Sequence, residues 1–406
     1  MRLSPRGKNK NQFYTSTNLE NDLSNQNILN NVILTNPLLK TVKALATASS
    51  DAQAKSAALS VVGPFGSGKS TSVLVGYHYL RGTLPNTIKK ALSTYKIPSL
   101  KKPFLKKEIK VITGVKKPLA AHLKQKLRIK NNLENAIQKK IKRGDRLVLI
   151  IDEFGKYLEY NADNPKNGDV YVLQQLAELA QRSNGNFILL TIRHQALSAY
   201  FSSVKTSYLN EWKKIQGRFN DLVHTASVNE TLAIFKSFNK SRFSNIDELK
   251  TPKLIMDCFK DNNSISVKEA EPILNESYPI HPFVLLIMIS GFKRFAQNER
   301  SLFTFLDSNE RYSVHEYLKG AKKGTVYGLA QLYDYISANM KYNLYESDIS
   351  SDWSMIDNAI NNLHLDSDDI TKVEHSELLT TIKTLGLIQA LGKEVGFTAN
   401  PKTIQA

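Results

Sequence analysis

The sequence predicts an α/β fold with a parallel sheet, followed by a helical lid and a C-terminal winged-helix-like domain. Two observations lead to this. In the first half of the chain, short apolar runs of strand length alternate with longer segments of helical spacing. Apolar runs without polar alternation are typical of strands buried on both faces, as in a parallel sheet. In the second half helical spacing dominates, which indicates a separate helical part.

The individual elements follow from local patterns. The predicted strands are 58–62, 110–113, 147–151, 186–192 and 222–225, and the predicted helices among them are 37–48, 71–80, 118–142, 170–182 and 209–216. Near the end of the chain we expect a helix over Glu377–Leu385 that Gly386 terminates. Two strands, 387–391 and 395–399, are then expected to flank a Gly-Lys turn, an order that is typical of a winged helix.

These patterns divide the chain into four predicted parts. They are a partly disordered segment 1–35, an α/β core 36–228, a helical lid 229–345 and a winged-helix-like domain 346–406. The last part stops abruptly, as in a truncated product or a shortened relative of a longer protein.

Composition narrows the class of protein. The 406 residues are 41% hydrophobic and 23% charged, with no apolar run long enough to span a membrane. The N-terminus lacks the apolar core of a signal peptide, and Cys258 is the single cysteine. We therefore expect no membrane partner, no disulfide framework and a cytoplasmic location.

The positive charge of the chain is concentrated in one segment. The net charge is +18, and residues 89–146 hold 19 Lys and Arg against three acids (Glu108, Glu134 and Asp145). A basic segment of this kind indicates DNA as a partner, together with the predicted winged helix. A lysine-coated solvated face is the alternative. Few aromatic residues lie in the segment, so a platform for stacking single-stranded bases is not expected.

The strongest chemical signal is a glycine-rich loop between the first predicted strand and the next helix. It has the spacing G-x-x-x-x-G-K-S and comprises Gly63, Pro64, Phe65, Gly66, Ser67, Gly68, Lys69, Ser70 and Thr71. Glycines let backbone N–H groups approach phosphate, and the helix turns its positive end toward the same anion. In such a loop Lys69 contacts the β- and γ-phosphates and Ser70 ligates Mg²⁺. The loop predicts a site for ATP and magnesium; a chance glycine loop is the alternative.

An acidic pair, Asp152-Glu153, follows the buried strand 147–151. Carboxylates at the end of a buried strand are costly unless a cation is nearby. The pattern predicts that Asp152 holds Mg²⁺ and that Glu153 is the general base toward the attacking water. An acidic helix cap after an ordinary strand is the alternative.

Weaker signals mark three further candidate positions. His194, or its neighbour Gln195, follows the predicted strand 186–192. If this strand lies beside strand 147–151, one of these side chains would orient the lytic water or contact the γ-phosphate. The alternative is that they are ordinary polar residues at the end of a strand. Arg218 precedes the last strand and could reach the γ-phosphate of a neighbouring subunit, or else form a local ion pair. Arg300 could close over the nucleotide from the lid, or else form a pair on a helix surface.

The order of these features resembles that of AAA+ ATPases of the origin-recognition type and of the related STAND ATPases. The resemblance implies ATP hydrolysis with a glutamate base. It also implies an arginine finger at Arg218, although Asn220 stands where the AAA+ segment has Asp, and a sensor 2 residue at Arg300.

A closer resemblance, over about residues 30–400, is to the large ATPases of bacterial anti-phage defence islands, including BREX-like systems. The phrases that carry it are Gly-Pro-Phe-Gly-Ser-Gly-Lys-Ser, Asp-Glu-Phe-Gly-Lys-Tyr-Leu-Glu, Glu-Trp-Lys-Lys-Ile-Gln-Gly-Arg-Phe, Tyr-Pro-Ile-His-Pro-Phe and Gln-Asn-Glu-Arg-Ser-Leu-Phe. It implies a homo-oligomer or other defence-system subunits as partners. Those relatives continue well beyond the length of this chain.

The sequence thus predicts an ATPase in which hydrolysis drives a rearrangement of lid and winged helix. Two other functions stay open. One is a nucleotide-dependent switch that assembles with negligible turnover, and the other is a small-molecule kinase, for which no compact acceptor site is evident.

Overall fold

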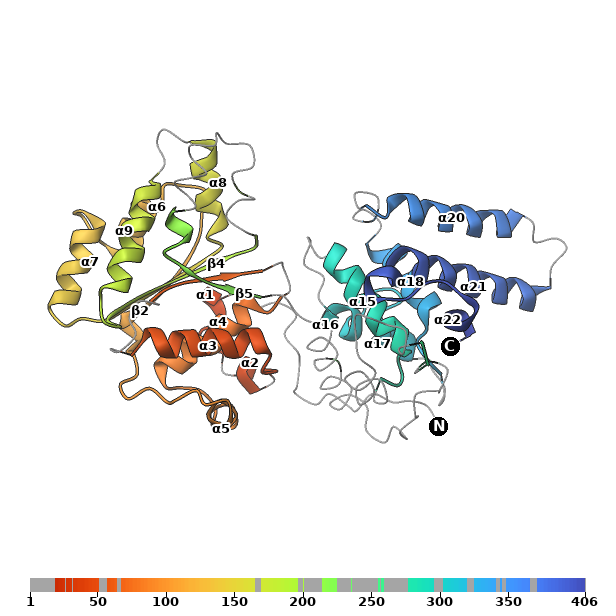
Figure 1. Cartoon of the computed structure of the whole chain (residues 1–406), viewed down its shortest axis with the longest axis horizontal. Helices are drawn as coiled ribbons and strands as arrows, with labels where there is room; N and C mark the ends of the chain where they lie inside the picture. Colours follow the sequence, from red (N-terminus) through yellow and green to blue (C-terminus); the bar gives the residue numbers. More distant parts are fainter. Residues whose placement is uncertain are drawn as a thin grey trace. The chain divides into compact units, whose positions relative to one another are not determined.

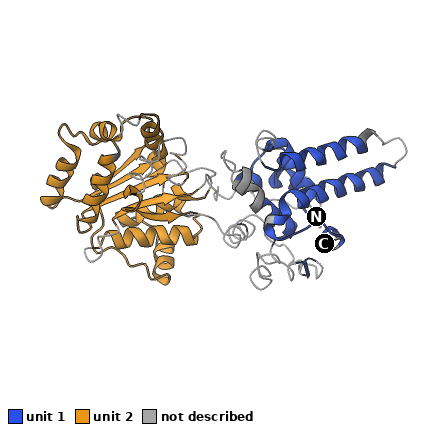
Figure 2. Cartoon of the chain, turned by 45° about the horizontal axis from the view of Figure 1, so that its top comes forward, with its two compact units in different colours: residues 1–15, 226–406 blue, residues 16–225 orange. Residues whose placement is uncertain are grey.

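The chain folds into two compact units (Figure 2), one of residues 16–225 and the other of residues 226–406 together with 1–15. The computed structural model describes residues 19–25, 27–30, 32–50, 57–63, 67–164, 169–195, 200, 214–224, 235, 255, 257–258, 277–295, 302–319, 325–340, 344, 348–365 and 371–405.

The first unit is built on a five-stranded parallel sheet. Its strands are β1 (Ala58–Val62), β2 (Ile109–Thr113), β3 (Leu147–Asp152), β4 (Phe187–Arg193) and β5 (Asn220–Val223). They lie in the order β2-β3-β4-β1-β5, and each neighbouring pair is parallel. The α/β class and the five predicted strands are therefore confirmed, with bounds that shift by one or two residues. The order places β4 between the strand that leads into the glycine loop and the strand that carries the acidic pair.

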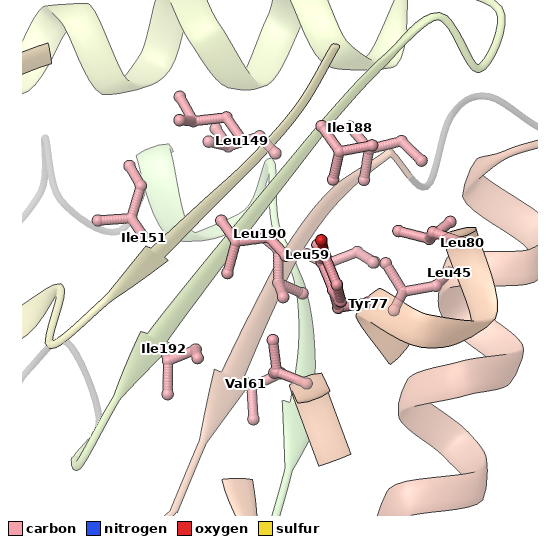
Figure 3. Close-up of a cluster of buried hydrophobic side chains, with 14 of the residues drawn as sticks. Leu45, Leu59, Val61, Tyr77, Leu80, Leu149, Ile151, Ile188, Leu190 and Ile192 are labelled. Atoms are coloured by element: carbon pink, nitrogen blue, oxygen red, sulfur yellow. The ribbon is translucent and has the colours of Figure 1, made fainter. Parts of the chain in front are cut away.

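Helices cover both faces of this sheet (Figure 1). Helices α3 (Asn36–Ala48) and α4 (Lys69–Arg81) pack against each other on one face. Helix α9 (Val170–Gln181) packs on β4 and β1 from the other face, together with α6 (Leu119–Leu127) and α7 (Leu133–Lys142). The core between the sheet and α3 and α4 is formed by aliphatic side chains and Tyr77 (Figure 3). This core fixes the ends of β1, β3 and β4 relative to the start of α4.

The single helix predicted over 118–142 is wrong: two helices, α6 and α7, occupy that span. Arg128 ends α6 with φ +55, a left-handed conformation that a helix cannot continue through. Asn132 then caps α7 by accepting a hydrogen bond from the backbone N–H of Asn135 at 3.0 Å. The end of α6 and the cap of α7 are both set by local conformations. They lie in a lysine-rich stretch whose apolar residues keep helical spacing throughout, so the spacing predicted one helix.

Shorter elements complete the unit. They are α1 (Leu19–Asp22), α2 (Asn27–Asn30), α5 (Asn86–Thr94), the 3₁₀ helix η2 (Lys106–Glu108) and α8 (Gly155–Asp163). Helix α1 lies against the edge strand β2, where Glu20 accepts a hydrogen bond from the backbone N–H of Thr113 at 3.1 Å. Helices α1 and α2 belong to the segment 1–35; its first 18 residues lie outside the described part.

The second unit is helical in its described part and has a hydrophobic core of its own. Its elements are α15 (Pro282–Phe295), α16 (Leu302–Asp307), α17 (Val314–Leu318), α18 (Leu329–Asn339), α20 (Ser350–Leu365), α21 (Lys372–Leu391), the 3₁₀ helix η4 (Gly392–Val395) and α22 (Pro401–Gln405). Among the helices that the structure describes, none is long and apolar enough to cross a membrane.

The hairpin expected at the end of the chain is not formed. Helix α21 continues through Gly386 to Leu391, and η4 follows where a Gly-Lys turn was predicted. Gly386 allows close packing, because a Cβ there would lie 2.4 Å from Cγ1 of Ile356 on α20. The glycine therefore brings two helices together and does not end one, so the winged-helix prediction is not confirmed.

Candidate functional site

The glycine loop joins β1 to α4 at the carboxyl edge of the sheet. Gly68 caps α4 with φ +75, a conformation that favours glycine. Gly63 has no room for a side chain, because a Cβ would lie 2.3 Å from the carbonyl oxygen of His224 and 2.9 Å from Oγ of Ser67. Pro64, Phe65 and Gly66 lie outside the described residues. The described part of the loop thus brings backbone to the N-terminus of a helix, as phosphate binding requires.

Lys69 is the first residue of α4, and its side chain is buried, with 5% exposed. Its Nζ donates a hydrogen bond to the carbonyl oxygen of Gly63 at 2.7 Å. Burial lowers the pKa of Lys69 to about 8, while the charge of Asp152 acts in the opposite direction. A buried ammonium of this kind is available to an anion in the loop.

The acidic pair lies at the carboxyl end of β3, one strand away from β1. Burial raises the pKa of Asp152, and the negative charge of Glu153 adds to the effect, while Lys69 opposes it. One oxygen of Asp152, Oδ1, accepts a hydrogen bond from the backbone N–H of Glu153 at 2.8 Å. Ser70 is half-buried in the first turn of α4. A carboxylate and a hydroxyl are ligands that Mg²⁺ accepts, so the donor chemistry of Asp152 and Ser70 fits this ion.

Glu153 has an unusual backbone conformation. Its φ is +47, which is rare for a residue other than glycine and common where a chain turns sharply at a functional site. Its carboxylate forms an ion pair with Lys156, in the first turn of α8. The predicted base is therefore held by a local cation in this structure.

His194 follows β4, and β4 does adjoin β3 as expected. Burial lowers the pKa of His194 to about 4; the charge of Lys69 contributes, and that of Glu153 opposes. The charges of the predicted lysine and the predicted base thus both act on this imidazole. The ring is neutral at pH 7 and can orient a water molecule without adding charge.

Arg193, directly before His194, is a buried cation, with 2% exposed. Its Nε donates to Oγ of Ser60 at 3.0 Å, and its Nη2 forms an ion pair with Asp221 at 2.7 Å. Gln216 donates to the other oxygen of Asp221 at 3.0 Å. Arg193 thus joins β4 to β1 and β5 just below the glycine loop.

His224 is a residue of this site that the sequence analysis missed. It follows β5, and Gly63 packs against its backbone and Cβ. Its Nε2 is hydrogen-bonded to Oγ1 of Thr41 on α3 at 2.9 Å. Burial lowers the pKa of His224 to about 4, and Lys69 also lowers it. Its position directly after a predicted strand could have identified it, because the carboxyl ends of parallel strands meet at one edge of the sheet.

The two arginine candidates have different outcomes. Arg218 forms the local ion pair that was the alternative interpretation, with Nε 2.8 Å from Oε1 of Glu178 on α9. Its carbonyl oxygen accepts a hydrogen bond from Gln181 at 2.7 Å, which fixes the turn before β5. Arg300 lies outside the described residues. An action of Arg218 on a neighbouring subunit stays a prediction.

No family model and no curated protein matches this chain. Among solved structures, it is similar to the ORC2 protein of Aeropyrum pernix in its ADPNP–ADP complexes, at 12% identity and a TM-score of 0.33. That match covers 89% of this chain and 82% of the other. A likeness this distant carries no argument about function, and the resemblance to defence-island ATPases stays a prediction from the sequence phrases.

Proposed function

We propose that this chain binds ATP with Mg²⁺ at the carboxyl edge of its sheet and hydrolyses the ATP. The observation that carries the proposal is the geometry around Lys69. A buried ammonium lies in a glycine loop that has no room for a Cβ at Gly63, at the start of a helix and within electrostatic reach of Asp152. An arrangement of this kind suits a chain of phosphates better than any uncharged ligand.

The roles follow from the contacts of each side chain. On binding, Lys69 exchanges its hydrogen bond with the Gly63 carbonyl for one with the β- and γ-phosphates. Ser70 and Asp152 would hold Mg²⁺, which neutralises phosphate charge when bound. Glu153 accepts a proton from water as the water oxygen attacks the γ-phosphorus and the bond to the β–γ bridging oxygen breaks, leaving ADP and phosphate. His194 is placed to orient that water.

The test compares three variants with the wild type. Lys69→Ala should lose ATP binding, measured by calorimetry. Glu153→Gln should retain binding and lose at least about 100-fold in turnover, because general base catalysis contributes about 10²–10⁴. Glu159→Gln, which removes the same charge from an exposed position on the following helix α8, should retain both. Full phosphate release from the Glu153→Gln protein would overturn the mechanism.

A second function, a switch that binds ATP and assembles without significant turnover, is favoured by one observation. The ion pair with Lys156 occupies the carboxylate that would act as base. ATP-dependent oligomers in size-exclusion chromatography, combined with slow hydrolysis that Glu153→Gln leaves unchanged, would support the switch.

We also propose, from the sequence resemblance, that the protein acts as a homo-oligomer or with other subunits in anti-phage defence or another DNA-directed process. In an oligomer Arg218 would leave Glu178 and contact the γ-phosphate bound to a neighbour. Arg218→Ala should then reduce turnover only under conditions where the oligomer forms. Unchanged turnover in a proven oligomer would remove this role.

A further inference from the structure

A cluster of cations lies at the amino edge of the sheet, where β2 and β3 begin, opposite the glycine loop. We call this cluster the basic edge. It consists of Lys101, Lys102, Lys106, Lys107, Lys139, Lys140, Lys142 and Arg143. Four of these residues precede β2 and four lie at the end of α7, which precedes β3.

The structure brings the two segments that carry these groups to the same edge of the sheet. Strands β2 and β3 pair in register from Ile109 and Val148, so the segments that lead into them end side by side. Arg146 makes the connection, because its guanidinium donates to the carbonyl oxygens of Lys102 at 2.9 Å and Pro103 at 2.6 Å. The two segments that carry the eight cations therefore meet at this edge of the sheet.

The positive charge of the basic edge is exposed and exceeds the negative charge of the acids around it. All eight residues are exposed, and none of them forms an ion pair with another described residue. Of the three acids in residues 89–146, Glu108 is already paired with Arg146 at 3.0 Å, and Glu134 lies in the first turn of α7, at the other end of that helix. Asp145 is the remaining acid.

Helix stability explains only part of this arrangement. Lysines in the last turn of α7 offset the negative end of its dipole. Lys101, Lys102, Lys106 and Lys107 lie outside any α-helix, so this reason does not apply to them. Lys106 and Lys107, together with Lys110 of β2, line a hollow of about 640 Å³ beside the edge strand, to which Glu20 of α1 contributes one carboxylate. A concave surface with several ammonium groups suits a phosphate backbone.

We propose that the basic edge binds the phosphate backbone of duplex nucleic acid without reading its sequence. A single strand is a poorer fit, because stacking needs exposed aromatic rings. Phe104 is buried, and the guanidinium of Arg146 lies over its ring, 4.1 Å from the ring centroid. Tyr95 is the exposed aromatic residue of segment 89–146. A lipid surface is a poorer fit because Tyr95 and Leu105 are the large apolar side chains exposed there. The proposal is independent of ATP hydrolysis, because the two surfaces lie at opposite edges of the sheet.

The experiment measures the fluorescence anisotropy of a labelled DNA duplex of arbitrary sequence, without nucleotide, over a series of NaCl concentrations. The wild type should bind with a steep dependence of log Kobs on log salt. The variant Lys101→Gln/Lys102→Gln/Lys106→Gln/Lys107→Gln should lose at least about tenfold in affinity at low salt. Its slope should fall by about 0.9 for each phosphate contact removed, up to about 3.6 for four.

The matched control changes four exposed lysines outside segment 89–146, in Lys40→Gln/Lys43→Gln/Lys372→Gln/Lys393→Gln. It lowers the net charge by the same amount and should keep the wild-type slope. Equal losses in the two variants would overturn the proposal, because they would show a general charge effect. So would a wild-type slope near zero, or poly-glutamate binding more tightly than the duplex at equal charge concentration.

Two additional variants keep the result interpretable. If the fourfold variant does not fold by circular dichroism, Lys139→Gln/Lys140→Gln on the exposed side of α7 tests the same surface with half the charge change. Lys69→Ala should bind the duplex as the wild type does, which separates a failure of the basic edge from a failure of the nucleotide site.

Discussion

The two edges of the five-stranded sheet use lysine in opposite ways. At the carboxyl edge Lys69 is buried beside Asp152 and fixed by a hydrogen bond to Gly63. At the amino edge the eight cations of the basic edge are exposed. A buried charge is costly to place and therefore suits a ligand that is held at one point. Exposed cations cost little and act together through their field, which suits a long polyanion. Position within one sheet thus separates a site for one triphosphate from a surface for many phosphates.

The largest expected effect tests whether the carboxyl edge depends on its buried charges. Arg193→Met leaves Asp221 without its buried partner, and breaking such a pair costs about 3–5 kcal/mol. Lys102→Met also replaces a cation by methionine, at an exposed position of the amino edge, and should stay within about 0.5 kcal/mol. Chemical denaturation measures both. Similar unfolding midpoints for the two variants would show that the edges do not differ in this way.

A smaller effect is expected from two glycine substitutions. In Gly63→Ala the new Cβ would lie 2.3 Å from the carbonyl oxygen of His224, and overpacking of this kind costs about 1–3 kcal/mol. Gly144→Ala, before β3, meets no atom within 4 Å but has φ +86, so it should cost about 1–2 kcal/mol of backbone strain. Calorimetry with ATP separates them, because only Gly63→Ala should weaken binding. Wild-type ATP affinity in Gly63→Ala would mean that the loop tolerates a side chain.

The sequence predicts the central strands β1, β3 and β4 well, because each is a largely buried apolar run that its own residues indicate without tertiary contacts. It also predicts that Lys69, Asp152 and His194 share one edge, since parallel strands end there together. The ion pair of Glu153 with Lys156 depends on a φ of +47 at Glu153, which residue identity does not indicate.

The wrong prediction at Gly386 and the missed residue His224 have a different origin. Gly386 has the same identity whether it ends a helix or lets two helices touch, and the choice depends on Ile356, 30 positions earlier. The side chain of His224 is hydrogen-bonded to Thr41, which lies in helix α3, far away in the sequence. Such partners are set by tertiary packing, which local patterns cannot show.

The pH dependence of ATP binding sharpens the contrast between a buried and an exposed lysine. Burial lowers the pKa of Lys69 to about 8 in the free protein, and the negative phosphates should raise it in the complex. ATP affinity should therefore be constant below this pKa and fall by about tenfold between pH 7 and pH 9. Proton uptake on binding at pH 8, measured by calorimetry in two buffers of different ionisation enthalpy, checks the sign.

The same pKa shift acts in the other direction on stability. The pKa of Lys69 lies below the unfolded value of 10.5, so the unfolded chain binds more protons between pH 8 and 10.5. The contribution of Lys69 to the free energy of unfolding therefore rises with pH in this window. Lys69→Arg keeps its charge throughout, and any residual ATP binding by this variant should not take up a proton. Proton uptake that persists in it would assign the titration to another group.

The smallest expected effect concerns the ion pair of Lys156 with the predicted base. In Lys156→Ala the carboxylate of Glu153 no longer has this local cation and is freer to accept a proton from water. Both side chains are partly exposed, and such pairs contribute about 0.2–1 kcal/mol, so turnover should rise by at most about fivefold. Lys116→Ala is the matched control, because it breaks an exposed ion pair with Asp163, at the other end of α8. A rise in Lys156→Ala alone, measured as phosphate release at saturating ATP, would identify this pair as a restraint on hydrolysis. Equal rates in both variants would mean that the Glu153 carboxylate leaves Lys156 without cost when ATP binds.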